Sequence, residues 1–235
     1  MRTTPAALHV PELADEPGLV HGFSTVAIGS VGLKHATDRS AVLASRQAFL
    51  RVMGLDGQAL TAVGAVHGAG VARVDEPVDS VDDVDALVTD QPGVVLFATY
   101  ADCYPIVLWD PVAHVAGLVH AGWRGTQAGV ARRAVGFMRD EFGCSYILAG
   151  IGPGICGRCY EVGEEVAVQF DARFVNPGQR GKWLLDLAAA NAAQLEEAGA
   201  KAVYETAMCT KESYLFPSHR RHPDGTRFGA IVALR

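Results

Sequence analysis

The stretch that decides the fold reads VVLFATYADCYPIVLWDPVAHVAGLVHAGWRGT over residues 94–126. Its first part, Val94 to Thr99, is a run of apolar and β-branched residues, which is typical of a buried strand. Ile106 to Trp109 and Val115 to Val119 are two further runs of this kind, and Asp110-Pro111 between them is a strong turn signal. We therefore predict three consecutive strands joined by turns.

Helical spacing begins where this stretch ends. We interpret Gly122 to Thr126 as a strand-to-helix turn, because apolar residues then recur at helical spacing up to Phe142. Upstream, Thr37 to Met53 has the same spacing, with Thr37 or Asp38 as a possible N-cap, and predicts a second helix. Downstream, Asp186 is a good N-cap for a third helix that stops at Gly199.

The remaining segments indicate a single domain. We expect short strands around Val203 and Ile231 to close the fold. Glycine and proline residues are distributed along the chain at expected turns, and the sequence contains no repeat and no long linker. The 235 residues also stay below the roughly 250 at which chains tend to split into several cores. We therefore predict one domain over residues 1–235.

The composition excludes several classes of protein. Hydrophobic residues make up 49% of the chain and charged residues 20%, which suits a globular protein with a substantial core. A net charge of -6 argues against binding to nucleic acid or to an anionic membrane. No apolar run reaches the roughly 18 residues that a membrane span needs. The N-terminus lacks a secretory apolar region and the five cysteines are an odd number, so we expect a cytoplasmic protein.

Cys103 and His120 stand at the ends of predicted strands. Cys103 follows a buried strand directly, and His120 ends another, with Pro105 to Val119 between them. Such ends can meet at one side of a sheet. The pair can then act as a thiol nucleophile with an imidazole base, or as two ligands of a metal. A catalytic zinc site needs a third protein ligand, and His67, in a glycine-rich segment, is the best candidate.

Other polar residues near these segments are candidates for supporting roles. Asp102 can act as a general acid or base, orient a ligand histidine, or merely cap a turn. Arg124 lies at a predicted helix N-terminus, where anions are favoured, and is a candidate phosphate ligand. Arg220 and Arg221 are further candidates, with surface salt bridges as their alternative.

Two other patterns carry less weight. Cys156 and Cys159 have the spacing of a redox or zinc pair, but no second Cys-x-x-Cys pair accompanies them, so we interpret them as structural. His219 and His222 flank two arginines, and no His-x-His pair occurs. A multicopper centre, which needs many imidazoles, therefore has little support.

Several segments together resemble the signatures of the polyphenol-oxidase or laccase-domain (YfiH-like) family, whose members are described as zinc-dependent purine nucleoside phosphorylases. They occur in the order typical of that family and span nearly the whole chain. These segments are AVHG (65–68), TYADCYP (99–105), HAGWRGT (120–126), GPGI (152–155), CYEV (159–162), CT (209–210) and SHRR (218–221).

The resemblance implies a fold, a metal and an activity. The fold would be α/β, with mixed sheets packed together and flanking helices, related to putative cysteine hydrolases. The positions matching His67, Cys103 and His120 would bind zinc, with copper as a less favoured metal. The partners would be phosphate and a purine nucleoside (adenosine, inosine, guanosine or methylthioadenosine), and adenosine deamination would be a second activity. No motif indicates an oligomeric state.

The chain departs from the family pattern at two places. Where the family has Phe-Ser-Thr-Arg, this chain has Val26 in place of the arginine. Asp224 to Arg227 also differs from the usual Thr-Gly-Arg, so the resemblance indicates a site role for Arg227 only weakly.

Three other functions compete with this one. The first is a hydrolase that edits cell-wall precursors, with Cys103 as nucleophile and His120 as base. The others are a polyphenol oxidase and a non-catalytic metal-binding module.

Overall fold

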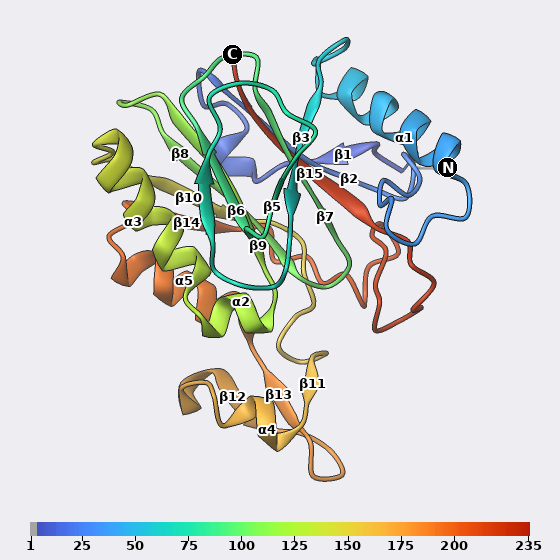
Figure 1. The fold of residues 1–235 in the computed structure, drawn as a ribbon. Helices are drawn as coiled ribbons and strands as arrows, with labels where there is room; N and C mark the ends of the chain where they lie inside the picture. Colours follow the sequence, from blue (N-terminus) through green and yellow to red (C-terminus); the bar gives the residue numbers. More distant parts are fainter. Residues whose placement is uncertain (1–3) are drawn as a thin grey trace.

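Two six-stranded mixed sheets form the body of the protein, and a small third sheet projects from its base (Figure 1). The computed structural model describes residues 4–235. The first sheet has the strand order β1 (Ala7–Leu8), β2 (Leu19–Ser24), β15 (Phe228–Leu234), β7 (Val95–Tyr100), β3 (Leu60–Gly64) and β5 (Ser80–Asp82). The second has the order β14 (Ala202–Glu205), β10 (Leu148–Ile151), β8 (Tyr104–Asp110), β9 (Val115–Ala121), β6 (Ala86–Thr89) and β4 (Val71–Arg73). The third has the order β11 (Glu161–Val162), β13 (Trp183–Leu185) and β12 (Val175–Pro177).

Helices cover the two outer faces of the paired sheets. Helix α1 (Arg39–Val52) lies against the first sheet, whereas α3 (Val130–Phe142) and α5 (Leu187–Glu197) lie against the second (Figure 1). This arrangement confirms the mixed α/β class; the relation to cysteine hydrolases stays a prediction. Within residues 4–235, no helix is both long and apolar enough to cross a bilayer. The short helices are η1 (Pro11–Leu13), α2 (Trp123–Gln127), α4 (Glu164–Ala167) and η2 (Ala172–Phe174).

The layered packing explains the apolar run that follows Val94. Alternate residues of a strand point to opposite faces of a sheet. In β7, Val95 and Phe97 pack in the cluster under α1, whereas Leu96 and Ala98 pack against the second sheet. Both faces of the strand are buried, so both sets of residues are apolar. The run therefore lacks the polar alternation of a strand with one solvated face.

The predicted helix starts are correct, and one predicted turn is wrong. The Asp38 carboxylate accepts a hydrogen bond from Ala41 N at the start of α1 (3.0 Å), and Asp186 accepts one from Ala189 N at the start of α5 (3.0 Å). The segment Gly122 to Thr126, which we expected to be a turn, instead forms most of helix α2. Thr126 N donates to Gly122 O at 2.8 Å, so a helical hydrogen bond replaces the predicted turn.

The C-terminal strand differs from the short closing strand that we predicted around Ile231. Strand β15 is seven residues long and lies inside the first sheet, hydrogen-bonded to β2 on one side and to β7 on the other. Ile231 stands opposite Gly22 and Phe97. Because these partners are far apart in sequence, local patterning indicates the strand but not its central place.

Candidate functional site

The three side chains predicted as metal ligands lie together at one end of the paired sheets. His67 follows β3, Cys103 lies in the turn between β7 and β8, and His120 is the penultimate residue of β9. Strands β8 and β9 are antiparallel, with Pro105 opposite His120, which brings the start of one strand to the end of the other. The ligand atoms of the three side chains lie within 4.8 Å of one another.

A buried carboxylate that the sequence did not single out holds this cluster. Asp85 is fully buried, and its Oδ1 accepts a hydrogen bond from Nδ1 of His120 at 2.9 Å. The same carboxylate accepts backbone N–H bonds from Val66 (3.3 Å), His67 (3.0 Å) and Gly68 (2.6 Å). With Nδ1 of His120 occupied, Nε2 is the nitrogen left to face the other two side chains. Asp85 follows several exposed acidic residues in the sequence, so the sequence does not distinguish it from them.

Two non-glycine residues at the site have left-handed backbone conformations, His67 with φ of 61° and Asp102 with φ of 86°. Such conformations are uncommon and persist only where surrounding bonds hold them. The N–H bonds to Asp85 hold the turn at His67. The turn at Asp102 is held by its backbone carbonyl, which accepts from Ile155 N at 2.9 Å.

The Asp102 carboxylate connects distant loops rather than orienting a ligand histidine. Its Oδ1 accepts from the Thr210 hydroxyl at 2.7 Å, and its Oδ2 accepts from Arg220 N at 2.8 Å. The orienting role that we considered for it belongs to Asp85. Because hydrogen bonds engage both carboxylate oxygens, the geometry favours a structural role for Asp102 over acid–base chemistry.

The cluster favours a charged thiolate. Burial alone raises the pKa of Cys103, but His120 and His67 outweigh this effect and lower it to about 6. Burial likewise lowers the pKa of His120, yet the charge of Cys103 and the hydrogen bond to Asp85 raise it to about 9. Burial also raises the pKa of Asp85, but the hydrogen bonds from His120 and Gly68 N lower it overall. The site thus combines a thiolate with an imidazolium that a second anion supports.

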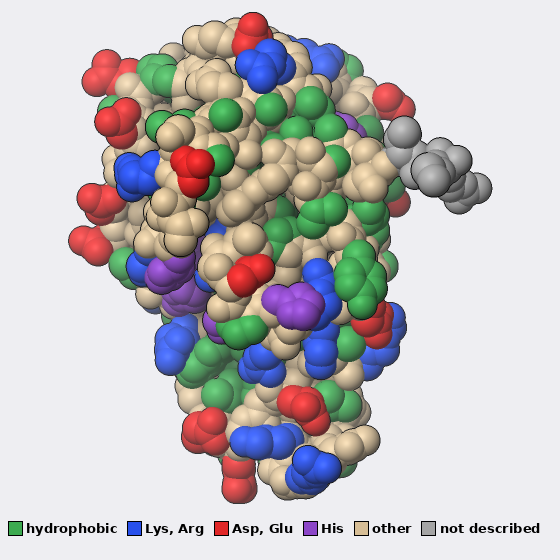
Figure 2. Space-filling view, turned by 90° about the vertical axis from the view of Figure 1, so that its right-hand side faces the viewer, with side chains coloured by type: hydrophobic (Ala, Val, Ile, Leu, Met, Phe, Trp, Pro, Cys, Tyr) green, Lys and Arg blue, Asp and Glu red, His purple; other side chains and the backbone are tan. Residues whose placement is uncertain are grey.

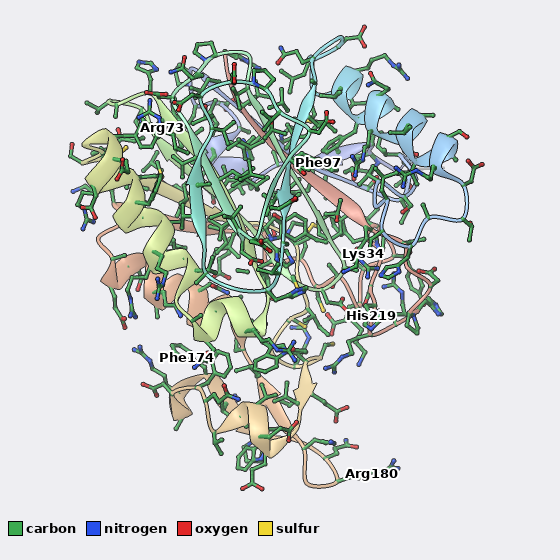
Figure 3. All side chains as sticks on the ribbon, in the orientation of Figure 1. Lys34, Arg73, Phe97, Phe174, Arg180 and His219 are labelled. Atoms are coloured by element: carbon green, nitrogen blue, oxygen red, sulfur yellow. The ribbon has the colours of Figure 1, made fainter. Side chains whose placement is uncertain are left out.

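The three side chains face a cavity of about 740 Å³. On the face in Figure 2, histidine and basic side chains gather above the small lower sheet. Lys34 and His219, which are far apart in the sequence, both line this cavity (Figure 3). The wall carries five lysine and arginine side chains and two large aromatic rings, which suit a small anionic or aromatic substrate. The basic residues are Lys34, Arg46, Arg124, Arg220 and Arg227, and the aromatic ones are Trp123 and Tyr160.

The predicted arginines separate into two groups. Arg124 stacks on the Trp123 ring at 4.3 Å and Arg220 stacks on the Tyr160 ring at 4.8 Å, and both line the cavity. Arg221 does not line it. Its guanidinium donates to backbone carbonyls, so the geometry disfavours phosphate binding by Arg221, which stays a prediction. These carbonyls belong to Thr210, Lys211, Ser213 and Phe216.

The two departures from the family pattern have different surroundings. Val26 is 47% exposed and does not line the cavity. Arg227, which was only weakly indicated, does line it. Lys34 and Arg46 lie on the same wall, and neither was predicted, because they come from a loop and a helix with no distinctive motif.

Comparisons with known proteins agree with this architecture. A protein of Deinococcus radiodurans named purine nucleoside phosphorylase is 37% identical, covering 97% of this chain and 92% of its own. A protein from an unknown prokaryotic organism, named adenosine deaminase RL5, is 37% identical over 78% of each chain. The crystal structure of YlmD from Geobacillus stearothermophilus superposes with a TM-score of 0.89 at 29% identity, covering 100% of this chain and 98% of the other.

The family model described as multi-copper polyphenol oxidoreductase laccase matches residues 20–235, which include the whole cluster and the cavity wall. This match covers more than nine-tenths of the 235 residues, and the D. radiodurans relative covers 97% of the chain. The chain therefore belongs to the multi-copper polyphenol oxidoreductase laccase family.

Proposed function

We propose that this protein is a zinc-dependent purine nucleoside phosphorylase that also deaminates adenosine. The observation that carries the proposal is the cluster of His67, Cys103 and His120 facing a cavity with basic and aromatic walls. The names of the D. radiodurans and RL5 relatives supply the two activities. A cytoplasmic location belongs to the same proposal, since free thiols persist in a reducing compartment.

The donor set suits zinc. Thiolate and imidazole are the ligands that zinc prefers, and three protein ligands with an open position are typical of catalytic sites. The site is also closely packed, because a Cβ on Gly122 would lie 2.9 Å from Sγ of Cys103 and 3.1 Å from Cδ2 of His67. Two imidazoles and one thiolate can also bind copper, so the metal content must be measured. When bound, zinc supplies a Lewis acid at the cavity.

The cavity walls can bind both reactants of phosphorolysis. In this reaction a phosphate oxygen forms a bond to C1′ of the ribose, the bond from C1′ to the base nitrogen breaks, and the base leaves with the electron pair and takes up a proton. Arg124 and Arg220 can bind the phosphate, and Lys34 adds positive charge on the same wall. Trp123 and Tyr160 offer ring faces for the purine.

Deamination requires a different co-reactant in the same cavity. An oxygen from water forms a bond to C6 of adenosine, and the exocyclic amine leaves as ammonia, which gives inosine. The cluster can position this water, because His120 is held in one orientation by Asp85 and cannot rotate freely. Phosphorolysis therefore requires phosphate, whereas deamination requires only water.

A second candidate function is a hydrolase with Cys103 as nucleophile. The lowered pKa of Cys103 and the raised pKa of His120 favour it, because a thiolate–imidazolium pair is the reactive state of such enzymes. A thiolate bound to a metal cannot serve as a free nucleophile, so metal content discriminates the two. A closed binding module is disfavoured, because the cluster contains three donor residues within the part of the chain that the structure describes.

The test is to incubate the metal-analysed protein with adenosine, with and without phosphate, and to identify products by mass spectrometry. We expect adenine and ribose 1-phosphate only with phosphate, and inosine without it. Cys103→Ala should abolish both products, whereas Cys144→Ala, which removes a buried thiol outside the cluster, should retain them. A zinc-loaded protein that yields neither product would contradict the proposal and favour the hydrolase.

A further inference from the structure

A second group of potential ligands lies outside the cluster described above. The donor atoms of Cys156, Cys159, Cys209 and Glu212 lie within 4.8 Å of one another. From sequence, the first two looked like a pair without partners. The fold supplies the partners, because the segment that contains Cys209 and Glu212 returns to the same place about fifty residues later.

The backbone holds both segments in position. At the first, the turn closes through Cys159 N and Tyr160 N, which donate to Cys156 O at 2.8 and 3.0 Å. At the second, Ser213 N donates to Cys209 O at 2.8 Å. The two segments are joined by a bridge between Gly154 and Cys209. The three sulfurs are therefore brought together by main-chain bonds that do not depend on the thiols.

The polar contacts of these side chains point to a cation. Cys156 N donates to Sγ of Cys209 at 3.4 Å, and the Cys159 thiol donates to Oε1 of Glu212 at 3.4 Å. N–H donors directed at a sulfur favour its thiolate form. Arg158 pairs with the Glu212 carboxylate, with Nε at 2.7 Å from Oε1, and balances part of the negative charge that three thiolates and a carboxylate would have.

We propose that Cys156, Cys159, Cys209 and Glu212 form a second metal site, which takes a divalent cation that prefers sulfur, of the zinc class. Four protein donors make a closed site, which is typical of structural zinc. Zinc–sulfur bonds of about 2.3 Å place tetrahedral sulfurs roughly 3.8 Å apart, within the spread of these donors. The proposal does not depend on the proposed function, because none of the four residues is a donor of the first cluster.

The second site supports the wall of the substrate cavity. Tyr160 follows Cys159 directly and lines the cavity. Thr210 follows Cys209 directly, and its hydroxyl donates to Asp102 beside Cys103. A metal at the second site therefore fixes two segments on which the cavity depends, without touching the substrate itself.

The test measures metal content in the full chain after removal of the first site. Cys103→Ser removes the only thiolate of the first cluster and leaves two imidazoles, so the zinc that is lost on further removal of Cys156 reports on the second site. We expect about one zinc per chain in Cys103→Ser and almost none in Cys103→Ser/Cys156→Ser. The matched control, Cys103→Ser/Cys144→Ser, removes the free thiol that lies in neither cluster and should keep its zinc.

Cobalt substitution gives a readout that does not depend on activity. In Cys103→Ser loaded with Co²⁺, an absorption band from thiolate-to-metal charge transfer should appear. The double variant Cys103→Ser/Glu212→Gln should keep this band but bind zinc more weakly. Glu212 is at the surface, so this variant tests the site even if loss of Cys156 prevents folding. Zinc should also raise the Tm of Cys103→Ser and not that of the double variant.

Three results would overturn the proposal. One is the absence of zinc from freshly reduced Cys103→Ser incubated with zinc. Another is zinc retained in full by Cys103→Ser/Cys156→Ser. The third is a stable disulfide between two of the three thiols in protein purified under reducing conditions. Failure of phosphorolysis in the unmodified protein overturns only the proposed function, since the second site is assayed without substrate.

Discussion

Asp85 is a single residue on which two of the three donors depend. Its carboxylate accepts from the His120 ring and from three consecutive backbone N–H groups around His67. Asp85→Asn has nearly the same shape, but its amide nitrogen cannot accept the bonds that one carboxylate oxygen now accepts. We expect metal affinity to fall by about 10- to 100-fold, measured by competition with a chelator. Asp82→Asn, at an exposed neighbouring carboxylate, should bind metal normally, and equal affinities for both variants would contradict the role of Asp85.

Gly122 is a second residue whose identity the site dictates. A Cβ there would meet Sγ of Cys103 at 2.9 Å and the His67 ring at 3.1 Å, so Gly122→Ala must displace at least one donor. We expect it to lose metal and activity while it keeps its far-UV circular dichroism. Gly136→Ala is the control, since nothing lies within 4 Å of a Cβ at that helical position. That change should leave metal binding intact and stabilise the fold by roughly 0.5–1 kcal/mol, and metal loss in it would refute the steric argument.

A site residue could be predicted where its neighbours in the sequence indicate its place in the fold, and could not where only contacts with distant segments do so. Cys103 and His120 stand next to strand-forming runs, so their place at strand ends follows from neighbouring residues. Asp85 is one acid among several, and only its contacts with the loop at His67 and with His120 in β9 distinguish it. The partners of Arg221 are backbone carbonyls, which the sequence does not reveal.

At the scale of elements, the strands were predictable and their neighbours were not. The apolar runs of β7, β8 and β9 are long enough to be recognised, and Asp110-Pro111 marks the point where β8 ends and the turn to β9 begins. Both partners of β15, strands β2 and β7, lie in the first half of the chain, far from Ile231 in sequence, so nothing near Ile231 reveals them. Pairing at long sequence separation depends on the packing of the whole sheet, and local propensity does not encode it.

The contact between the N-terminal segment and strand β2 makes stability depend on pH. His21 is buried in β2, and its Nε2 accepts a hydrogen bond from Val10 N at 3.0 Å. Burial, together with the nearby His9, lowers the pKa of His21 from 6.5 to about 4. Between these values the unfolded chain binds a proton that the folded chain excludes. The contribution of this histidine is therefore complete above about pH 6.5 and is lost as the pH falls towards 4.

This prediction can be measured by denaturant unfolding at a series of pH values. We expect the free energy of unfolding to decrease by a few kcal/mol between pH 6.5 and 4 because of His21. His21→Gln cannot titrate, so its unfolding free energy should fall less over the same range. His222→Gln, at an exposed histidine, should behave as the unmodified protein does. A slope that is the same in all three proteins would rule out His21 as the source.

At the scale of the whole molecule, we propose that residues 1–235 form one cooperative domain. The two large sheets share a core, in which Phe23 and Phe228 of the first sheet lie in one cluster with Trp109 of the second. We expect one unfolding transition, with coincident curves from tryptophan fluorescence and circular dichroism. Two separated transitions would contradict a single domain.

Removal of residues 228–235 should prevent folding, because it takes β15 out of the middle of a sheet, whereas removal of Arg235 alone should not.

The donor residues come from strands and the turns at their ends, whereas much of the cavity wall comes from loops, and this difference affects how substrate preference can evolve. Cys103 and His120 are anchored where β7, β8 and β9 meet, whereas much of the cavity wall comes from the loops around Lys34 and Arg227. Loops tolerate insertions and substitutions far better than strands in a packed core. A lineage can therefore remodel the wall without disturbing the donors. Directed evolution should find altered substrate preference among variants of residues 32–35 and 225–227, with the metal content unchanged.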